Sequence, residues 1–279
     1  MSVALNSMAV TEFDAHVKAA YQKAGLLRRT ARVKTGIQGA TEKFRRYNKG
    51  VATPRIPQTD VTPMNAGYAE ATASLSDWNA PEYTDIFDQQ TVNFSEREVV
   101  ATNIAGAIGR REDQLILDQL DTANPAPNVD TNVGGATTGL NLVKVRRAMR
   151  LLNSRAVPRE DRFIVHSSIA LEQILGATEA TSSDFNTVKT LVNGEMNRFL
   201  SFEWIEVEDR DEGGLPFAST LRTNYAYHKQ AVGLAIGIDF RTDVNYVPEK
   251  TSWLANGLFK AGAAVIDPNG VIEIQTTEP

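Results

Sequence analysis

Cysteine is absent from this chain of 279 residues, and the absence excludes disulfide bonds and thiolate metal sites. A chain without disulfides suits a reducing cytoplasm. No apolar run approaches the roughly 20 residues that a membrane-spanning helix needs. The N-terminus MSVALNSMAVTEFD also lacks the basic start of a secretory signal. We therefore expect a soluble protein that has no membrane partner.

Histidine is scarce as well, and its pattern argues against an enzyme or a metal site. His16, His166 and His228 lie far apart, and none belongs to a metal-binding spacing such as HExxH. His166 and Ser167 follow a strand-like segment, but the G-x-S-x-G elbow of a nucleophile turn is missing. A serine in that position is typical of a helix cap. A hydrolase that uses His166 and Ser167 is kept as a minor alternative.

Ligand-binding loops are missing too. The segment GGATTG (134–139) lacks the Lys-Ser/Thr pair of a phosphate loop. The carboxylates between residues 203 and 212 lack the spacing of a calcium loop. We therefore expect no catalytic residue, no cofactor and no bound metal.

Charge is distributed unevenly along the chain, although the net charge is only −5. Residues 1–55 carry eleven Lys and Arg against three acids, a balance of 11 − 3 = +8. Residues 56–98 carry one Arg against eight acids, a balance of 1 − 8 = −7. Such blocks can neutralise each other within a chain or between neighbouring chains. A nucleic-acid binder would need the basic block to be free, and the acidic isoelectric point of about 5.4 argues against that.

The basic block centres on the stretch TARVKTGIQGATEKFRRYNKGVATPR (30–55). It offers few apolar residues to bury, so it needs a surface to rest on. We expect its cations to meet carboxylates of another copy of the protein. The candidates for this contact are six cations of the stretch and four carboxylates that follow it: Arg32, Lys34, Lys43, Arg45, Arg46, Lys49, Asp77, Glu82, Asp85 and Asp88.

The strongest structural prediction is a long helix over residues 95–122. Ser95 and Glu98 match a capping box, and apolar residues then recur at helical spacing. The helix has a slim waist of small residues against which strands can lie close: Ala101, Ala105, Gly106, Ala107 and Gly109. Shorter helices are predicted over residues 9–25, from about 141 to 152, over 168–175 and near 184–192.

Strands are predicted on both sides of these helices. TARVKTG and TEKFRRYN, with GIQGA between them, predict a long two-stranded ribbon, which is marginal in water unless it has a partner surface. Residues 51–94 contain short strand-like pieces, GYAEATASLSDW and QQTVNF, and indicate extended connections without a core of their own. Buried strands are predicted at RFIVHS and FEWIEVED, and the β-rich C-terminal third contains VGLAIGIDF, RTDVNYVP, LFKAGAAVID and GVIEIQ.

Three stretches together resemble the major capsid proteins of tailed bacteriophages, which have the Hong Kong 97-type fold. They are AYQKAGLLRRTARVKTGIQGATEKFRRYNKG, VKTLVNGEMNRFLSFEWIEVED and HKQAVGLAIGIDFRTDVNYVPEKTSWLANGLFKAGAAVIDPNGVIEIQ. The similarity follows the same order over nearly the whole chain, although no single motif is diagnostic.

The resemblance implies an α+β subunit with five segments. These are an N-terminal arm (1–27), an extended β-hairpin loop (28–77), a peripheral domain (78–140) with a spine helix (95–122), an axial domain (141–240), and closing strands shared by both domains (241–279). The acidic loop near 208–214 would lie close to a five- or six-fold axis or on the outer surface.

The resemblance also implies partners and a location. Copies of the subunit would form hexamers and pentamers of an icosahedral virion shell, which encloses double-stranded DNA without sequence-specific binding. The type member of the family carries a long cleaved scaffolding segment, whereas the ribbon here is predicted to begin near residue 28. We therefore expect a separate scaffolding protein, together with a portal, and assembly in the cytoplasm of the host bacterium. The alternatives are an encapsulin-like compartment shell and a nucleic-acid-binding protein that uses residues 28–55.

Overall fold

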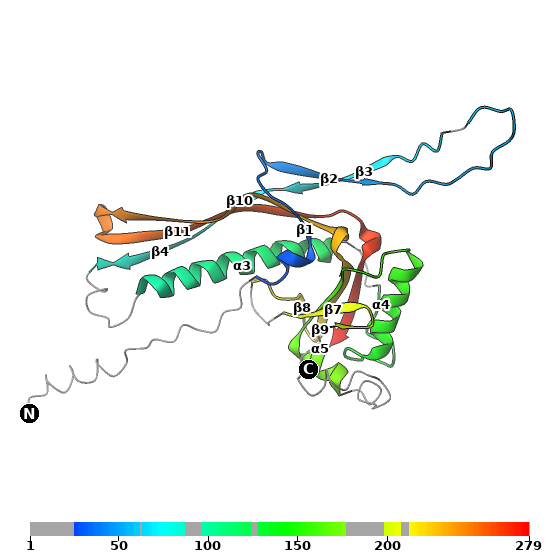
Figure 1. Cartoon of the computed structure of the whole chain (residues 1–279). Helices are drawn as coiled ribbons and strands as arrows, with labels where there is room; N and C mark the ends of the chain where they lie inside the picture. The colour runs from blue at the N-terminus through cyan, green and yellow to red at the C-terminus, as the bar shows by residue number, and fades with distance from the viewer. Residues whose placement is uncertain are drawn as a thin grey trace, which may run out of the picture.

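The protein is described here by a computed structural model that covers residues 25–61, 63–86, 96–123, 128–176, 198–207 and 212–278. Within these ranges it is an elongated α+β subunit with a long sheet at one end, a smaller body, and a hairpin that projects beyond the body (Figure 1). The helices predicted over 9–25 and near 184–192, and Ser95 of the capping box, lie outside the described residues.

A four-stranded sheet forms the long end of the subunit, in the order β1-β10-β11-β4. β1 runs parallel to β10, whereas β10–β11 and β11–β4 are antiparallel. The predicted segments VGLAIGIDF and RTDVNYVP are one strand, β10, whose register shifts between Ile236 and Arg241 keep it paired to β11. The strands are β1 (Arg32–Lys34), β4 (Ser76–Asp85), β10 (Val232–Val247) and β11 (Ser252–Val265).

The predicted long helix is confirmed as α3 (Glu96–Thr122), which packs along β11 and β4. At about 1.5 Å per residue, a helix of this length spans roughly 40 Å. The small residues at the waist of α3 also allow the N-terminal segment at Gly25 to cross close to the helix at Gly109. A Cβ atom on Gly25 would lie 2.8 Å from the carbonyl oxygen of Gly109, so only a glycine fits at this crossing.

A second, six-stranded sheet forms the smaller body, in the order β12-β9-β5-β7-β6, with β8 paired to β9. Every residue of β5, the predicted buried strand, is buried because helices cover both faces of this sheet. The strands are β5 (Arg162–His166), β6 (Arg198–Phe199), β7 (Phe202–Glu206), β8 (Phe217–Ala218), β9 (Leu221–His228) and β12 (Val271–Thr277).

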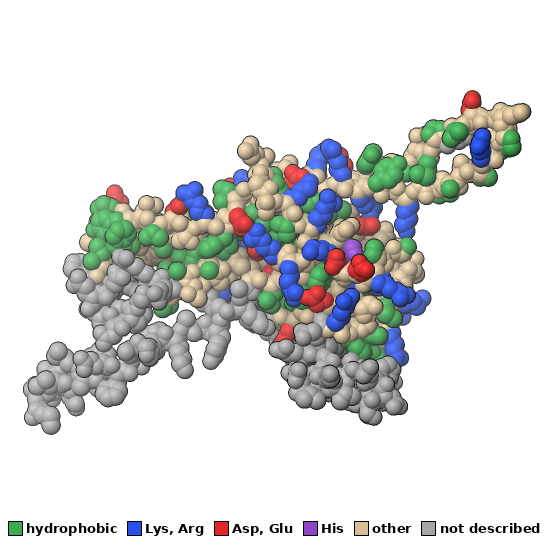
Figure 2. All heavy atoms as spheres, viewed as in Figure 1, with side chains coloured by type: hydrophobic (Ala, Val, Ile, Leu, Met, Phe, Trp, Pro, Cys, Tyr) green, Lys and Arg blue, Asp and Glu red, His purple; other side chains and the backbone are tan. Residues whose placement is uncertain are grey.

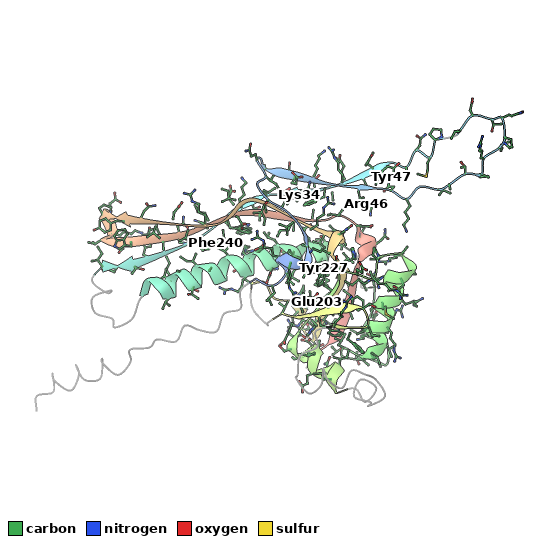
Figure 3. The ribbon with its side chains drawn as sticks, in the orientation of Figure 1. Lys34, Arg46, Tyr47, Glu203, Tyr227 and Phe240 are labelled. Atoms are coloured by element: carbon green, nitrogen blue, oxygen red, sulfur yellow. The ribbon has the colours of Figure 1, made fainter. Side chains whose placement is uncertain are left out.

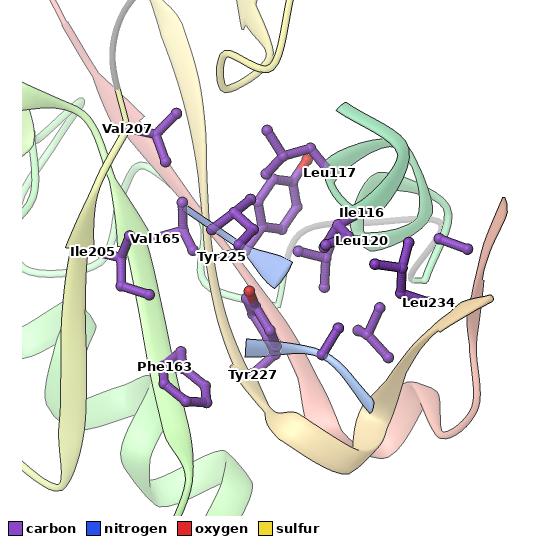
Figure 4. Packing of buried hydrophobic residues seen from close by; sticks show 14 of the residues in the cluster. Ile116, Leu117, Leu120, Phe163, Val165, Ile205, Val207, Tyr225, Tyr227 and Leu234 are labelled. Atoms are coloured by element: carbon purple, nitrogen blue, oxygen red, sulfur yellow. The ribbon is translucent and has the colours of Figure 1, made fainter. Parts of the chain in front are cut away.

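Side chains alternate between the two faces of the six-stranded sheet, so buried residues of the same strand belong to two different hydrophobic clusters. Phe163, Val165 and Tyr227 point toward α3 and pack near Leu117 and Leu120 (Figure 4). The residues between them, such as Ile164 and Ala226, face the two shorter helices on the other side. The sheet is therefore the shared wall of two hydrophobic clusters.

The two shorter helices of the body confirm their predictions. In α4 (Leu142–Ser154), the side chain of Asn141 caps the N-terminus by accepting from the backbone N–H of Lys144 at 2.8 Å. In α5 (Ser168–Leu175), Ser167 accepts from the backbone N–H of Ala170 at 3.1 Å. Ser167 is thus the helix cap that the sequence predicted.

The predicted pairing within the ribbon is wrong. TARVKTG and TEKFRRYN do not pair with each other, because β1 is taken by the edge of β10. β2 (Thr41–Tyr47) pairs instead with β3 (Tyr68–Ser74), across a long loop, and forms the projecting hairpin (Figure 1). The strand-like piece GYAEATASLSDW predicted within residues 51–94 is confirmed, because residues 68–85 form β3 and β4.

Candidate assembly surface

The base of the β2–β3 hairpin is packed against its own chain. Phe44 is fully buried, and its ring lies over Gly233 of β10, where a Cβ atom would come within 2.7 Å of the ring. Phe44 belongs to a small cluster with Ala73, Leu75 and Ile266. The sequence predicted that this stretch needs a surface to rest on, and at Phe44 the sheet of the same subunit supplies that surface.

Beyond its base, the hairpin exposes apolar residues. Tyr47 and Tyr68 face each other across the strands with ring centroids 4.9 Å apart, and both remain exposed. The loop that joins the strands exposes four more apolar side chains, Val51, Ile56, Val61 and Met64. An exposed apolar segment that has no core of its own is typical of a surface that another protein covers.

Several cations of the hairpin form ion pairs within the same chain. The Lys43 Nζ lies 2.9 Å from a carboxylate oxygen of Glu70, and the Arg45 Nε lies 3.1 Å from the other oxygen. The hydrogen bond from Lys43 is the main cause that lowers the pKa of Glu70. Lys34 pairs with Glu42 at 2.5 Å, so Lys34 and Lys43 already have carboxylate partners.

A pocket of about 500 Å³ lies where the hairpin meets the body, and we call it the base pocket. Its walls come from β1, the hairpin, the end of α4, the η2 turn (Lys229–Ala231) and the η4 turn (Pro268–Gly270). Arg46 and Tyr47 mark its upper rim (Figure 3). Its charged lining residues are Arg32, Arg45, Arg46, Lys49, Arg155 and Asp267.

The base pocket carries excess positive charge. Five cations and one carboxylate line it, a balance of 5 − 1 = +4. His228 also lines the pocket, but burial lowers the pKa of its ring, so it is neutral at pH 7 and adds no charge. Figure 2 shows Lys and Arg side chains gathered below the hairpin, around a histidine.

Only two of these five cations have a carboxylate partner within the described part of the chain. Arg46 pairs with Asp267 and Arg45 with Glu70. Arg155 donates to the backbone carbonyls of residues 269 and 271, and Lys49 donates weakly to the carbonyl of Arg155 at 3.4 Å. Arg32 makes neither an ion pair nor a side-chain hydrogen bond to any described residue.

The predicted acidic candidates lie elsewhere. Asp77, on β4, pairs with Lys260 of β11 at 3.1 Å, and Glu82 accepts from Asn103 of α3 at 3.3 Å. Asp85 ends β4, and Asp88 lies outside the described residues. One subunit therefore does not bring the predicted cations and carboxylates together, and their contact between copies stays a prediction.

Sequence reasoning missed the contribution of Arg155 to this surface. It immediately follows α4, more than a hundred residues after the hairpin, and no local pattern marks it. Its guanidinium is held at the pocket by two backbone carbonyls, Asn269 of η4 at 3.2 Å and Val271 of β12 at 3.3 Å. Only the tertiary structure brings it beside Lys49.

A second charged cluster lies where the N-terminal segment meets α3. Asp113 is fully buried and accepts from the backbone N–H groups of Leu26 and Leu27 at 2.9–3.1 Å. Arg28 forms a bidentate pair with Asp239 of β10, at 2.9 and 2.7 Å, and lies 3.6 Å from Glu112. These contacts anchor the start of the described chain to the middle of the long helix.

The geometry around His166 and Ser167 does not support the hydrolase alternative. The Ser167 hydroxyl is held by the buried carboxylate of Glu278 and caps α5, while His166 Nδ1 lies 2.9 Å from the carbonyl oxygen of Ser167. Glu278 is in turn paired with Arg222 at 2.8 Å. A nucleophile needs a base within reach of its own hydroxyl, whereas this serine is engaged in a structural network.

Two further searches bear on other kinds of site. Within the described ranges, no group of three or more His, Asp and Glu side chains could hold a metal ion. No helix in these ranges is long and apolar enough to cross a membrane.

Comparison with known proteins gives consistent results. The profile of the phage capsid protein family matches residues 5–278. No curated protein matches the sequence. The capsid of cyanophage P-SCSP1u is similar in structure, with a TM-score of 0.76, 15% identity, and coverage of 96% of this chain and 92% of that one. The head structure of Helicobacter pylori bacteriophage KHP40 has a TM-score of 0.75, 12% identity, and coverage of 99% and 97%. A Mycobacterium phage Che8 chain has a TM-score of 0.68, 16% identity, and coverage of 93% of each chain.

Proposed function

Because this chain belongs to the phage capsid protein family and is a major capsid protein that forms the phage head shell, we propose that its copies assemble as hexamers and pentamers of an icosahedral shell. The observation that supports assembly into hexamers and pentamers is the projecting hairpin. Its base packs on its own subunit, while its apolar outer half is exposed. In a shell, a neighbouring copy covers that outer half.

The proposal includes an assignment of domains within the Hong Kong 97-type fold. The four-stranded sheet with α3 forms the peripheral domain, and the six-stranded sheet with α4 and α5 forms the axial domain. The two separate sheets support this division. The expected boundary between 141–240 and 241–279 falls inside β10, so residues 232–240 go with the four-stranded sheet, whereas β12 joins the body. The hairpin of β2 and β3 (residues 41–74) lies within the extended loop of residues 28–77, and residues 1–27 are the arm.

We extend the proposal to partners and location. The shell is a virion capsid that encloses double-stranded DNA without sequence-specific binding, and it is built in the cytoplasm of the host bacterium with a separate scaffolding protein and a portal. The subunit has no catalytic activity, in line with the structural role of its family. The acidic balance of the chain also supports a container, because a strongly cationic lining would hold the DNA by its phosphates.

Negative-stain microscopy of the purified full-length chain tests this function. We expect uniform polyhedral shells or rings of subunits. A monodisperse monomer that retards DNA on a gel would overturn the proposal in favour of a nucleic-acid-binding protein. Shells that co-purify with an enzyme cargo would instead indicate a cellular compartment.

Substitutions in the outer half of the hairpin test the role of this element. Val51→Ser and Ile56→Ser replace exposed apolar side chains, so the melting temperature of the unassembled subunit should stay unchanged while the yield of shells falls. Thr59→Ser, in the same loop, serves as the matched control. An equal loss of both stability and assembly would show that the loop belongs to the core of its own subunit.

A further inference from the structure

The base pocket concentrates positive charge that its own chain does not neutralise. Arg32, Lys49 and Arg155 line the pocket without a carboxylate partner among the described residues. Like charges held this close repel one another unless an anion enters. The pocket is therefore preorganised for carboxylates or phosphates.

Strand β4 has the complementary charge and lies at an edge of its sheet, where another copy can reach it. Its sequence, SDWNAPEYTD, contains Asp77, Glu82 and Asp85 and no Lys or Arg. β4 is one edge of the four-stranded sheet, and β1, which carries Arg32 into the pocket, begins the opposite edge. β4 also runs from the hairpin toward the far end of the subunit (Figure 1).

We infer that the base pocket of one subunit binds the carboxylates of strand β4 of a second copy. The inference rests on the proposed shell function and identifies the partner surface within it. Two different edges of the same sheet meet in this contact, so it is heterologous, and repeated contacts of this kind close into a ring when the rotation allows.

The structure also narrows the set of cations that take part. Lys34 and Lys43 pair with Glu42 and Glu70, so the cations without a carboxylate partner are the contact residues in this arrangement. Arg155, which the sequence did not indicate, takes the place of Lys34 and Lys43. On β4, Asp77 pairs with Lys260, but 79% of its side chain is exposed, so it can exchange this partner.

Filling the pocket also fixes the orientation of the hairpin. The hairpin base is held to its own subunit by the small cluster at Phe44, by the pair of Lys34 with Glu42, by the pair of Arg46 with Asp267 and by the weak bond from Lys49. A carboxylate that bridges Lys49 on the hairpin side and Arg32 on the body joins the two walls. Binding of β4 therefore sets the direction in which the hairpin reaches the next subunit.

Charge reversals test the contact with the full-length chain. Arg32→Glu and Lys49→Glu each reverse a pocket cation that contributes little to the fold, so the melting temperature of the unassembled subunit should not change. Assembly, measured by sedimentation, should fall about tenfold or more, as expected for a charge contact repeated around a ring. Arg150→Glu, on the exposed side of α4 outside the pocket, is the matched control and should assemble like the wild type.

Reversing the charge of the β4 carboxylates should also reduce assembly, and combining these changes with pocket charge reversals should restore it. Asp77→Lys with Asp85→Lys should reduce assembly, and combining this pair with Arg32→Glu and Lys49→Glu, which changes the pocket balance to 3 − 3 = 0, should restore shells. Pocket variants that assemble as well as the wild type, or a charge swap that restores nothing, would overturn the inference. Binding of short duplex DNA that depends on Arg32, together with normal assembly of the β4 variants, would identify a phosphate occupant and overturn it as well.

Crosslinking separates this inference from the proposed function. A carbodiimide joins an amine directly to a carboxylate, and in a mixture of ¹⁴N- and ¹⁵N-labelled chains it should link Lys49 of one copy to β4 of another. Such mixed-isotope links are expected in rings or smaller oligomers even when closed shells do not form. Failure of the wild type to form shells would refute the proposed function, whereas links from Lys49 to other segments alone would refute the pocket assignment.

Discussion

Replacing Glu112 by glutamine is predicted to stabilise the subunit at neutral pH. Glu112 lies on α3 and is 7% exposed, and its Oε1 accepts no hydrogen bond from any described residue. Burial raises the pKa of Glu112 to about 7, opposed by Arg28 and reinforced by Asp113 on the same helix and Asp239 on β10. Burying the ionised carboxylate therefore lowers the free energy of unfolding, and a neutral amide of the same shape does not carry this desolvation penalty.

The direction of the pH dependence follows from the raised pKa. Below pH 4.5, both the folded and the unfolded chain keep the proton, and Glu112 has no effect on stability. Between pH 4.5 and about 7, the unfolded chain releases the proton first, so the free energy of unfolding falls as the pH rises. A difference of 7 − 4.5 = 2.5 pH units corresponds to about 3.4 kcal/mol at 1.36 kcal/mol per unit. Screening by water at the exposed edge reduces this to about 2 kcal/mol.

Urea unfolding of the full-length chain, kept below the concentration at which it assembles, measures the effect. Glu112→Gln should match the wild type near pH 4.5 and exceed it by about 2 kcal/mol near pH 8, with a melting temperature higher by about 5 °C. Glu249→Gln, at an exposed position in the η3 turn (Pro248–Lys250), is the control. A variant that is less stable than the wild type near pH 8 would show that attraction to Arg28 outweighs the cost of burial, and the reasoning would be wrong.

Two further substitutions test packing and a buried cation. Gly233→Ala should destabilise the subunit by about 1–3 kcal/mol in urea unfolding, because the new methyl group meets the ring of Phe44; combining it with Phe44→Leu should recover part of the loss, and no recovery would place the strain elsewhere. Lys144 is fully buried, its Nζ donates to the carbonyls of Thr138 and Gln275 at 2.6 and 2.9 Å, and burial lowers its pKa from 10.5 to about 8. The stability of the wild type relative to Lys144→Met should therefore rise by about 2 kcal/mol between pH 8 and 10.5, and a difference that is constant with pH would contradict the buried-cation argument.

Local patterns in the sequence were sufficient to predict the elements whose formation depends mainly on their own residues. α3, α4 and α5 follow from helical spacing and from caps such as Asn141 and Ser167. The burial of β5 follows from its continuous apolar run. These predictions were confirmed because propensity, periodicity and capping act over a few residues and do not depend on which surface lies opposite.

Strand pairing and the composition of the candidate site depended on contacts that are distant in sequence. The pattern of side chains around Arg32 is compatible with pairing to TEKFRRYN and with pairing to β10. In the folded subunit the segment pairs with β10, because that strand has a free edge beside it. Phe44 is buried because a glycine on another strand leaves room for its ring.

The sequence by itself determined the three helices, the buried strand and the opposed basic and acidic blocks, because each is a property of neighbouring residues. The tertiary structure alone decided which cations remain free for a partner. It pairs Lys34 and Lys43 within the chain, leaves Arg32 and Lys49 at the base pocket without a carboxylate partner among the described residues, and adds Arg155 to them. The physical reason is that an ion pair depends on a separation of a few ångströms in space, and a linear pattern does not encode that separation.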